Sequence, residues 1–231
     1  MPASAPDRSA AEAAVECPLC RGRFSAFLPA GRREGVVCPG CGSRERHRAS
    51  WLFLEERPEL LTGAGSLLHF APEAYLRDRL AATPGLRYIT ADLVPGRGDL
   101  ALDVTDLKLP DETFDALVCS HVLEHVPDDR GAMRELYRIL RPGGWAIVMV
   151  PLDIRLDCTY EDPSITDPEE RVKAFLQFDH VRLYAPDIAD RLREAGFQVE
   201  DVPVAERVGP ERAQRYGLLV SDRVFLCSKG S

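Results

Sequence analysis

Hydrophobic and polar positions follow two different periods across residues 114–150. Phe114–Ser120 and Trp145–Val150 are apolar runs without alternation, a pattern typical of strands buried on both faces. Between them, about Asp129–Leu140, apolar residues recur with a helical period and predict an amphipathic helix that ends at Pro142-Gly143-Gly144. The residues of its apolar stripe are Met133, Leu136, Tyr137 and Leu140. Two parallel strands joined through this helix form a right-handed βαβ unit.

Shorter apolar runs and helical patterns predict the remaining elements of the same domain. Strands are expected at residues 66–70, 86–91, 99–102, 197–202 and 223–228. Helices are expected at residues 73–82, 169–176, 187–195 and 210–216. Residues 151–168 are polar and carry no periodic signal, so we expect a long loop there, a candidate lid.

Residues 111–151, which read DETFDALVCSHVLEHVPDDRGAMRELYRILRPGGWAIVMVP, are similar to the central part of class I, Rossmann-like S-adenosylmethionine (SAM) dependent methyltransferases. The resemblance extends over about Ser66–Lys229. It implies an α/β fold with a seven-stranded, doubly wound sheet that is mostly parallel and has an antiparallel last strand. It also implies SAM as the cofactor and methyl transfer as the reaction.

The loop His69–Glu73 departs from the family pattern, in which a D-x-G-x-G-x-G loop lets the backbone approach the cofactor. By position, His69 replaces the acidic residue, and Ala71, Glu73 and Tyr75 replace the glycines. The resemblance makes His69, Ala71 and Glu73 cofactor-binding candidates, with the Glu73 carboxylate accepting a hydrogen bond from the SAM ammonium group. The alternatives are that Glu73 only complements a helix dipole and that His69 is a hydrogen-bonded core residue.

Further cofactor-binding positions follow from the same resemblance. Asp92, with Leu93 beside it, matches the position that binds the ribose hydroxyls, and its alternative role is a turn residue before Pro95. Asp103 matches the position that binds the adenine amino group, and Val104 would line the adenine plane. Ser120 and His121 leave a predicted strand at its carboxyl end, where open α/β sheets bind ligands.

Seven cysteines include two C-x-x-C pairs, Cys17/Cys20 and Cys38/Cys41, separated by 17 residues. Zinc takes four such sulfur ligands in a tetrahedron, and the doubled spacing predicts a structural zinc-ribbon-like module in which iron is the alternative ion. Four thiolates leave no open position for catalysis. The spacing also favours a reducing compartment, and no membrane span or secretory signal is visible, so we expect a cytoplasmic protein.

Domain boundaries follow from these patterns. We expect a disordered tail at 1–14, the cysteine module at 15–43, a connecting helix at 44–62 and the methyltransferase domain at 63–231. The connecting helix would start at a Ser43 cap and run to about Leu61.

Charge is distributed unevenly along the chain, whose net charge is −8. Residues 17–48 carry seven Arg and two Glu, a net +5, and residues 1–16 carry −2, which leaves −11 for the remainder. Only the N-terminal module could therefore attract a nucleic acid. Arg44 and Arg48 share a helix face, where they either bind a phosphate or carboxylate or form a solvated surface.

Candidate catalytic residues cluster in Gln177–Tyr184 and at His125. In the first stretch, an Asp-His pair, Arg182 and Tyr184 lie within six residues and suggest substrate binding. His180 is the first candidate for a general base, because a neutral imidazole takes a proton near pH 7, and Asp179 is its neighbour. His125 either faces the substrate or caps the next segment. A hydrogen-bonded structural turn is the alternative for residues 177–184.

Three functions remain open at this point. The first is methyl transfer to an oxygen or nitrogen of a small molecule or sugar, favoured by the acidic main domain. In the second, RNA or protein is recruited by the basic module. In the third, the fold has lost SAM and survives as an interaction protein.

Overall fold

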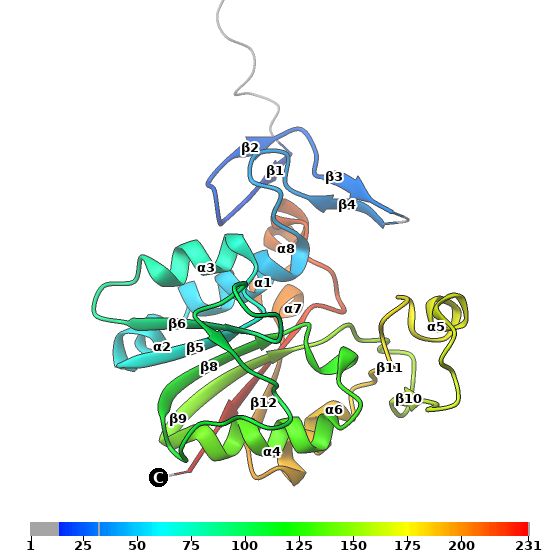
Figure 1. The fold of residues 1–231 in the computed structure, drawn as a ribbon. Helices are drawn as coiled ribbons and strands as arrows, with labels where there is room; N and C mark the ends of the chain where they lie inside the picture. The colour runs from blue at the N-terminus through cyan, green and yellow to red at the C-terminus, as the bar shows by residue number, and fades with distance from the viewer. Residues whose placement is uncertain (1–13, 32, 231) are drawn as a thin grey trace, which may run out of the picture.

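A seven-stranded sheet forms the centre of the protein (Figure 1). The computed structural model describes residues 14–31 and 33–230, so the tail expected at 1–14 lies, except for Ala14, outside the described residues. The strand order is β12-β13-β9-β8-β5-β6-β7. The strand bounds are β5 Ser66–Phe70, β6 Arg87–Asp92, β7 Leu100–Ala101, β8 Phe114–Ser120, β9 Leu140–Met149, β12 Gln198–Pro203 and β13 Arg223–Ser228.

Strand direction confirms the predicted fold class. Strands β5 to β9 pair in parallel with their neighbours, whereas β13 runs antiparallel to both β9 and β12. The carboxyl ends of the parallel strands therefore meet along one edge of the sheet, which is where open α/β sheets bind ligands.

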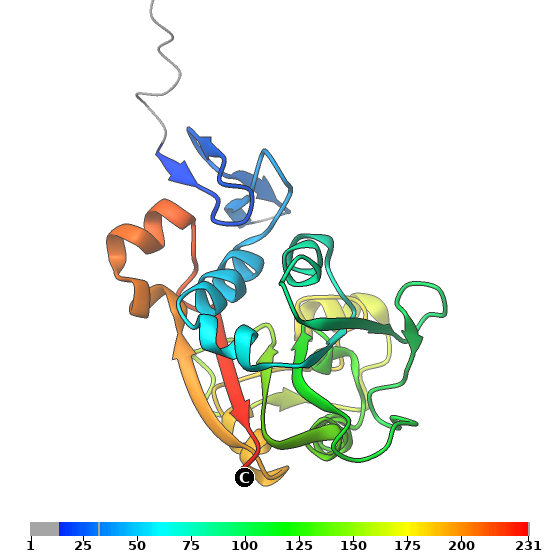
Figure 2. The ribbon, with the colours of Figure 1, turned by 90° about the vertical axis from the view of Figure 1, so that its left-hand side faces the viewer.

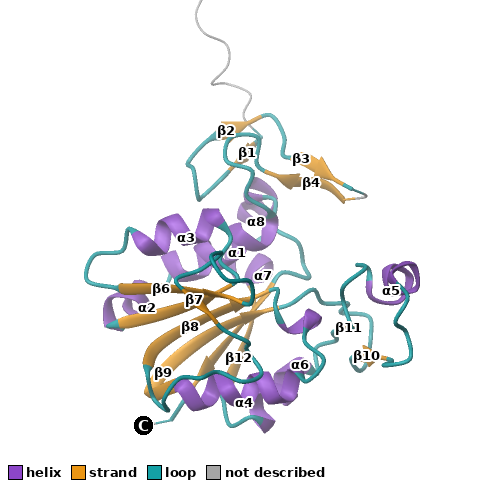
Figure 3. Cartoon of the chain, viewed as in Figure 1, coloured by secondary structure: helices purple, strands orange, loops and turns teal. Residues whose placement is uncertain are grey.

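Separate sets of helices cover the two faces of the sheet (Figure 3). Leu117 and Cys119 of β8 pack into one hydrophobic cluster, whereas Ala116 and Val118 pack into the other. The first face is covered by α4 (Asp129–Ile139) and α6 (Ile188–Glu194). The second is covered by α1 (Glu45–Glu55), α3 (Ala74–Ala81) and α7 (Val204–Val208). Burial on both faces explains why β8 lacks hydrophobic alternation.

The predicted βαβ unit of β8, α4 and β9 is confirmed with one correction. The Asp128 carboxylate caps α4 by accepting a hydrogen bond from Gly131 N at 2.8 Å. Strand β9 begins at Leu140, not at Trp145 as predicted. Pairing shifts between the two ends of the ladder, so residues 141–144 bulge out of it. Pro142 does end the helix, because it disfavours helical backbone before it, but the chain continues directly as strand.

The N-terminal module, residues 15–43, consists of two small hairpins above the sheet domain (Figure 1). The first pairs β1 (Val15–Glu16) with β2 (Arg23–Phe24), and the second pairs β3 (Leu28–Ala30) with β4 (Arg33–Val37). Figure 2 shows α1 beneath this module, between α3 and the segment that carries α7 and α8 (Pro210–Tyr216).

The single helix expected from Ser43 to about Leu61 is wrong in two respects. The chain forms two helices, α1 and α2 (Pro58–Gly63), which separate because a proline at the first turn has no N–H to continue the earlier helix. The N-cap of α1 is Arg44, not Ser43. The Ser43 hydroxyl lies instead beside the sulfurs of Cys17 and Cys41, at 3.3 and 3.2 Å.

The segment after β9 extends away from the sheet and carries α5 (Pro168–Phe175), close to the predicted helix (Figure 1). The expectation of an irregular loop over 151–168 is only partly right, because β10 (Tyr160–Glu161) pairs with β11 (Arg182–Leu183). The Glu161 carboxylate accepts hydrogen bonds from Arg182 and Arg191 at 2.9 and 3.1 Å. These contacts attach the base of the segment that carries α5 to the sheet domain. Over the described part of the chain, no helix has the length and apolar character needed to cross a bilayer.

Candidate functional site

A cleft of about 710 Å³ opens at the carboxyl edge of the parallel strands. The ends of β5 and β8 supply Ala71, Glu73, Ser120 and His121. The β3–β4 hairpin and the start of α1 supply Arg33, Arg44 and Arg46. The segments after β8 and α5 supply Glu124, His125, Gln177 and His180. The N-terminal module and the sheet domain therefore share one cavity.

The loop after β5 turns sharply without a glycine. Ala71 has a φ of 45°, in the left-handed region that favours glycine, and its N–H donates to the carbonyl of Ala91 at 2.7 Å. A methyl group is the smallest side chain after hydrogen, so the backbone still comes close to the cleft. The contact of Ala71 with the cofactor stays a prediction.

His69 does not line the cleft, contrary to its predicted contact with the cofactor. Its side chain is only 2% exposed, and its Nδ1 is hydrogen-bonded to the Tyr88 hydroxyl at 2.8 Å. Burial lowers the pKa of the imidazole to about 3, so it is neutral at pH 7. His69 is the hydrogen-bonded core residue of the alternative interpretation.

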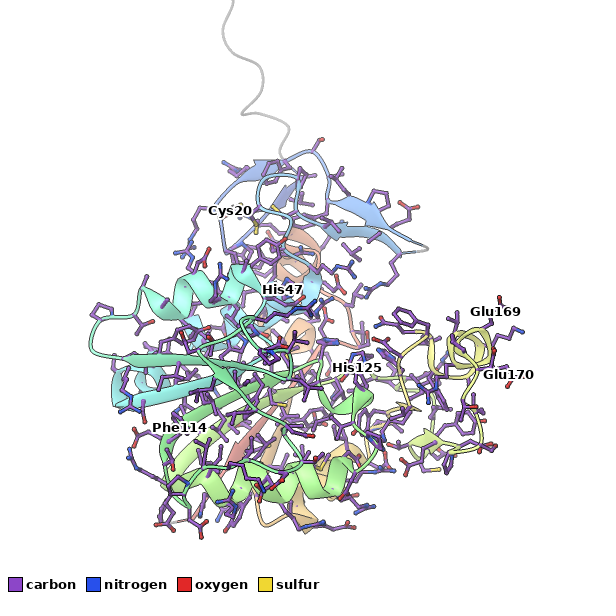
Figure 4. The ribbon with its side chains drawn as sticks, viewed as in Figure 1. Cys20, His47, Phe114, His125, Glu169 and Glu170 are labelled. Atoms are coloured by element: carbon purple, nitrogen blue, oxygen red, sulfur yellow. The ribbon has the colours of Figure 1, made fainter. Side chains whose placement is uncertain are left out.

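Glu73 lines the cleft but is already bound by the protein. Its carboxylate accepts a hydrogen bond from Arg46 at 2.5 Å and lies against the imidazole of His47, which Figure 4 labels. Burial raises the pKa of Glu73, but these two partners outweigh burial and lower it to about 2. Arg46 and His47 were not predicted as partners of Glu73. The spacing of R-x-R-H-R on one helix gave no sign of which residues turn inward.

Four predicted cofactor residues lie at neighbouring strand ends, outside the lining of this cleft. Asp92 ends β6, and its Oδ1 accepts from Val94 N at 2.8 Å. Oδ1 of Asp103 accepts from the N–H and hydroxyl of Thr105 at 2.9 and 2.7 Å. In each carboxylate, no hydrogen bond among the described residues reaches Oδ2. Leu93 is exposed and Val104 is buried.

Glu124, His125 and His180, here called the glutamate–histidine cluster, form one wall of the cleft. One potential ligand atom from each lies within 4.8 Å of the others. The rings of His125 and His180 have centroids 4.8 Å apart (Figure 4 labels His125). His121 Nδ1 lies 3.1 Å from Glu124 Oε1, and Asp179 Oδ2 lies 3.4 Å from His125 Nδ1. The structure thus unites the three predicted catalytic residues and adds Glu124, which the sequence analysis had not assigned.

Two other residues of 177–184 face inward. Arg182 is 3% exposed and donates to the carbonyls of Leu123, Val126 and Pro127 at 2.9, 2.5 and 2.8 Å. Tyr184 is fully buried, and its hydroxyl donates to an Asp129 carboxylate oxygen at 2.7 Å. Substrate binding by these two side chains is therefore wrong, whereas Gln177 and His180 do line the cleft.

The four predicted metal ligands Cys17, Cys20, Cys38 and Cys41 lie together, with their sulfurs within 4.8 Å of one another. The distances from Cys17 to Cys41 and from Cys20 to Cys38 are 3.8 and 3.7 Å between sulfurs. Sulfurs bound to Zn²⁺ at 2.3 Å in a tetrahedron stand about 3.8 Å apart, so the arrangement is consistent with a zinc-binding module.

The two cysteine knuckles have the same backbone geometry. Arg21 N donates to Cys17 O, and Gly42 N donates to Cys38 O, each at 2.8 Å. Arg21 and Gly42, which follow the second cysteine of each pair, both have left-handed φ values, 61° and 76°. Each knuckle is therefore a tight turn that presents two sulfurs on one side.

Arg48 is neither a ligand-binding residue nor part of a solvated surface, the two roles that the sequence left open. The side chain is 0% exposed, and its guanidinium lies 3.9 Å from the centroid of the Phe27 ring. It donates to four carbonyls, those of Val36, Ser43, Tyr216 and Gly217, at 2.6–3.0 Å. Arg48 thus ties the N-terminal module to the C-terminal part of the sheet domain. Arg44, in contrast, lines the cleft and forms no ion pair with the described residues.

Comparison with known proteins identifies the family to which this fold belongs. A family model described as a methyltransferase domain matches residues 80–148. The chain contains a class I SAM-dependent methyltransferase domain. A demethylmenaquinone methyltransferase of Thermus thermophilus is 33% identical to the chain in a 129-residue alignment that covers 48% of this chain. The chain spans 55% of that relative's length.

Solved structures support the fold of the methyltransferase domain. The [4+2]-cyclase SpnF superposes with a TM-score of 0.56 at 18% identity, over 84% of this chain and 86% of that one. A SAM-dependent methyltransferase from Archaeoglobus fulgidus gives a TM-score of 0.52 at 15% identity, over 79% and 94%. Because a cyclase also carries this fold, the fold alone does not define the reaction.

Proposed function

We propose that the protein transfers the methyl group of SAM to an oxygen or nitrogen atom of a small molecule bound in the cleft. The observation that carries the proposal is the cleft itself. It lies at the carboxyl edge of a methyltransferase sheet, and its volume is typical of a small-molecule site. Relatives support a small-molecule acceptor, since the Thermus relative is named a demethylmenaquinone methyltransferase.

Cofactor binding is assigned to the strand ends. Asp92 and Asp103 each offer a free carboxylate oxygen, one for ribose hydroxyls and one for the adenine amino group. Ala71 lets the backbone approach, and the ionised Glu73 faces the cleft for the ammonium group. When bound, SAM supplies a sulfonium methyl group, and the residues of the cleft hold the acceptor in line with it.

Acceptor choice is assigned to the walls of the cleft. Arg44, which forms no ion pair with the described residues, would attract a carboxylate or phosphate group on the acceptor, and Gln177 would donate or accept a hydrogen bond. Three arginines of the module and of the start of α1 form ion pairs within the protein: Arg21 with Glu55, Arg33 with Glu45 and Arg46 with Glu73. That pairing leaves less positive charge for a phosphate backbone, so recruitment of RNA lacks support.

The cysteine module is assigned a structural Zn²⁺ ion. Its four sulfurs fit a tetrahedral zinc, and its own hydrophobic cluster has only four buried members, Cys17, Leu19, Phe27 and Cys38. A module this small folds on the metal rather than on its core. Because Arg33 of the module lines the cleft together with Arg44 and Arg46 of the adjoining segment, the module forms part of the acceptor site rather than a separate recruiting arm.

Calorimetric titration of the zinc-loaded protein with SAM and with S-adenosylhomocysteine tests the proposal. We expect micromolar binding that Asp92→Ala weakens at least about tenfold, or about 1.4 kcal/mol. Asp106→Ala is the matched control, because Asp106 is exposed and pairs only with Lys108. Transfer of radiolabelled methyl from SAM to a panel of small acceptors then tests the reaction. Absence of SAM binding at millimolar concentration would refute the assignment and favour an interaction protein.

A further inference from the structure

Glu124 presents a buried oxygen that lacks a partner. The residue is 1% exposed, and its Oε2 has no hydrogen-bond partner among the described residues. Its other oxygen, Oε1, lies 3.1 Å from His121 Nδ1. A buried carboxylate oxygen without a partner is costly, and native structures normally supply a proton donor, a water or an ion.

Two histidines beside Glu124 are oriented as metal ligands usually are. His180 Nδ1 is hydrogen-bonded to the carbonyl of Phe175 at 2.9 Å. That carbonyl can only accept, so Nδ1 carries the proton and Nε2 keeps its lone pair. His125 Nδ1 lies 3.4 Å from both the backbone oxygen and the carboxylate of Asp179, which favours the same tautomer. No hydrogen bond among the described residues reaches either Nε2. A second-layer carbonyl or carboxylate of this kind commonly orients metal-binding histidines.

We propose that Glu124, His125 and His180 bind a divalent first-row transition-metal ion, such as Zn²⁺ or Mn²⁺, on the acceptor side of the cleft. Two imidazoles and one carboxylate within 4.8 Å suit such an ion and leave coordination positions open toward the cavity. The carboxylates of Glu124 and Asp179 balance its charge. His121 lies close enough to Glu124 to orient the carboxylate.

The role of the ion rests on the proposed function, whereas its binding does not. An acceptor hydroxyl bound to the ion loses its proton to solvent water more readily. Its oxygen then forms the bond to the methyl carbon, and the carbon–sulfur bond breaks with its electron pair going to sulfur. The products are the methyl ether and S-adenosylhomocysteine. An imidazole nitrogen that binds a metal cannot also take a proton, so this role replaces that of His180 as a general base.

Equilibrium dialysis of the zinc-loaded protein against Zn²⁺ and, separately, against Mn²⁺ tests the site. Thiolates hold Mn²⁺ poorly, so Mn²⁺ reports the glutamate–histidine cluster without the cysteines. We expect one equivalent of ion beyond that held by the cysteines, with a Kd that rises at least about tenfold in Glu124→Gln and in His125→Ala. Glu169→Gln is the control, since Glu169 points outward from α5 in Figure 4 and should leave the Kd unchanged.

His125→Ala guards against misfolding, because His125 is partly exposed and its loss leaves no buried carboxylate unpaired. Far-ultraviolet circular dichroism confirms that each variant is folded. The proposal fails if neither ion binds beyond the cysteine equivalent, or if both variants bind as tightly as the control. SAM titration of the same variants is a separate readout, so that a missing metal site is distinguished from a missing cofactor site.

Discussion

Two groups of side chains that could hold a metal ion lie in the described part of this protein, and they differ in how they are built. The cysteine cluster comes from two short knuckles with the same turn geometry, each supplying two sulfurs. The glutamate–histidine cluster joins a turn after β8 to a segment 55 residues later. The first is closed by four sulfurs, whereas the second faces a cavity.

Because of that difference, we expect the cysteine cluster to contribute to stability and the glutamate–histidine cluster to contribute to function. A closed four-sulfur site has no coordination position for a substrate, so its contribution is to folding. A three-residue site at the wall of a cleft has open positions and contributes little to folding. Mutations in the two clusters should therefore change different measurements.

The largest effect is expected from Cys38→Ser, which removes a buried sulfur of the closed cluster. Structural zinc contributes on the order of 10 kcal/mol to such modules, so the module should unfold and take one wall of the cleft with it. Fluorescence of Trp51, which packs against the module's cluster, should follow the change on heating or chelation. Cys158→Ser is the control, because Cys158 is exposed and outside the cluster, and an equal loss there would contradict the expectation.

His69 tests how burial of a neutral imidazole changes the pH dependence of stability. Its folded-state pKa, about 3, lies below the value of 6.5 for a free imidazole, so stability should fall as pH drops from 6.5 toward 3. The full loss is about 5 kcal/mol. Denaturant unfolding between pH 7 and 4 should show a shallower pH dependence in His69→Asn than in the parent. Both proteins keep the cysteine cluster, so zinc loss in acid affects them alike.

Arg48 tests whether the closed cluster depends on its attachment to the sheet domain. Arg48→Met leaves four carbonyls without their donor, and we expect a loss of at least about 3 kcal/mol in the free energy of unfolding. Thermal unfolding measures it. Arg155→Met, at a side chain 85% exposed, should leave the melting temperature unchanged. Equal melting of Arg48→Met and the parent would show that the module docks without this residue.

Glu124→Gln should have the smallest effect on stability and so tests the difference between the two clusters. Glu124 Oε2 has no hydrogen-bond partner to lose among residues 14–31 and 33–230, and we expect a change under about 1 kcal/mol in the free energy of metal-free unfolding. In the parent, Mn²⁺ at 100 times its Kd should raise stability by about 2.7 kcal/mol, and the same Mn²⁺ concentration should raise that of the variant by about 1.4 kcal/mol or less. A metal-independent loss comparable to that of Cys38→Ser would assign Glu124 to the fold instead.

Local sequence patterns were enough to predict much of the fold. The cysteine knuckles are defined within four residues each, and α4 by a stripe that includes Met133 and Leu136, so both were predictable. The strand start at Leu140 was not, because the bulge over 141–144 depends on pairing with β8. Helix period alone could not show that Arg48 is buried, since its four partners come from distant segments.

The residues that form the site could largely be predicted from the sequence, but the role of each residue could not. His125, Asp179 and His180 do meet, yet Glu124 completes the cluster through a turn that the sequence does not reveal. His69 was misassigned because a strand-end position looks alike whether its side chain faces a cleft or Tyr88. Arg182 and Tyr184 look like substrate ligands in sequence, but tertiary packing turns them toward backbone carbonyls and Asp129.

Arg48 also constrains the order in which the chain acquires its structure. Val36 and Ser43, two residues that accept hydrogen bonds from Arg48, lie within 12 residues of it in the sequence. Tyr216, a third acceptor, is synthesised 168 residues later. The cysteine knuckles can take up metal early, because their ligands lie within 25 consecutive residues. Their docking onto the sheet must wait until α8 has been made. Metal capture by the knuckles would therefore precede assembly of the cleft during synthesis.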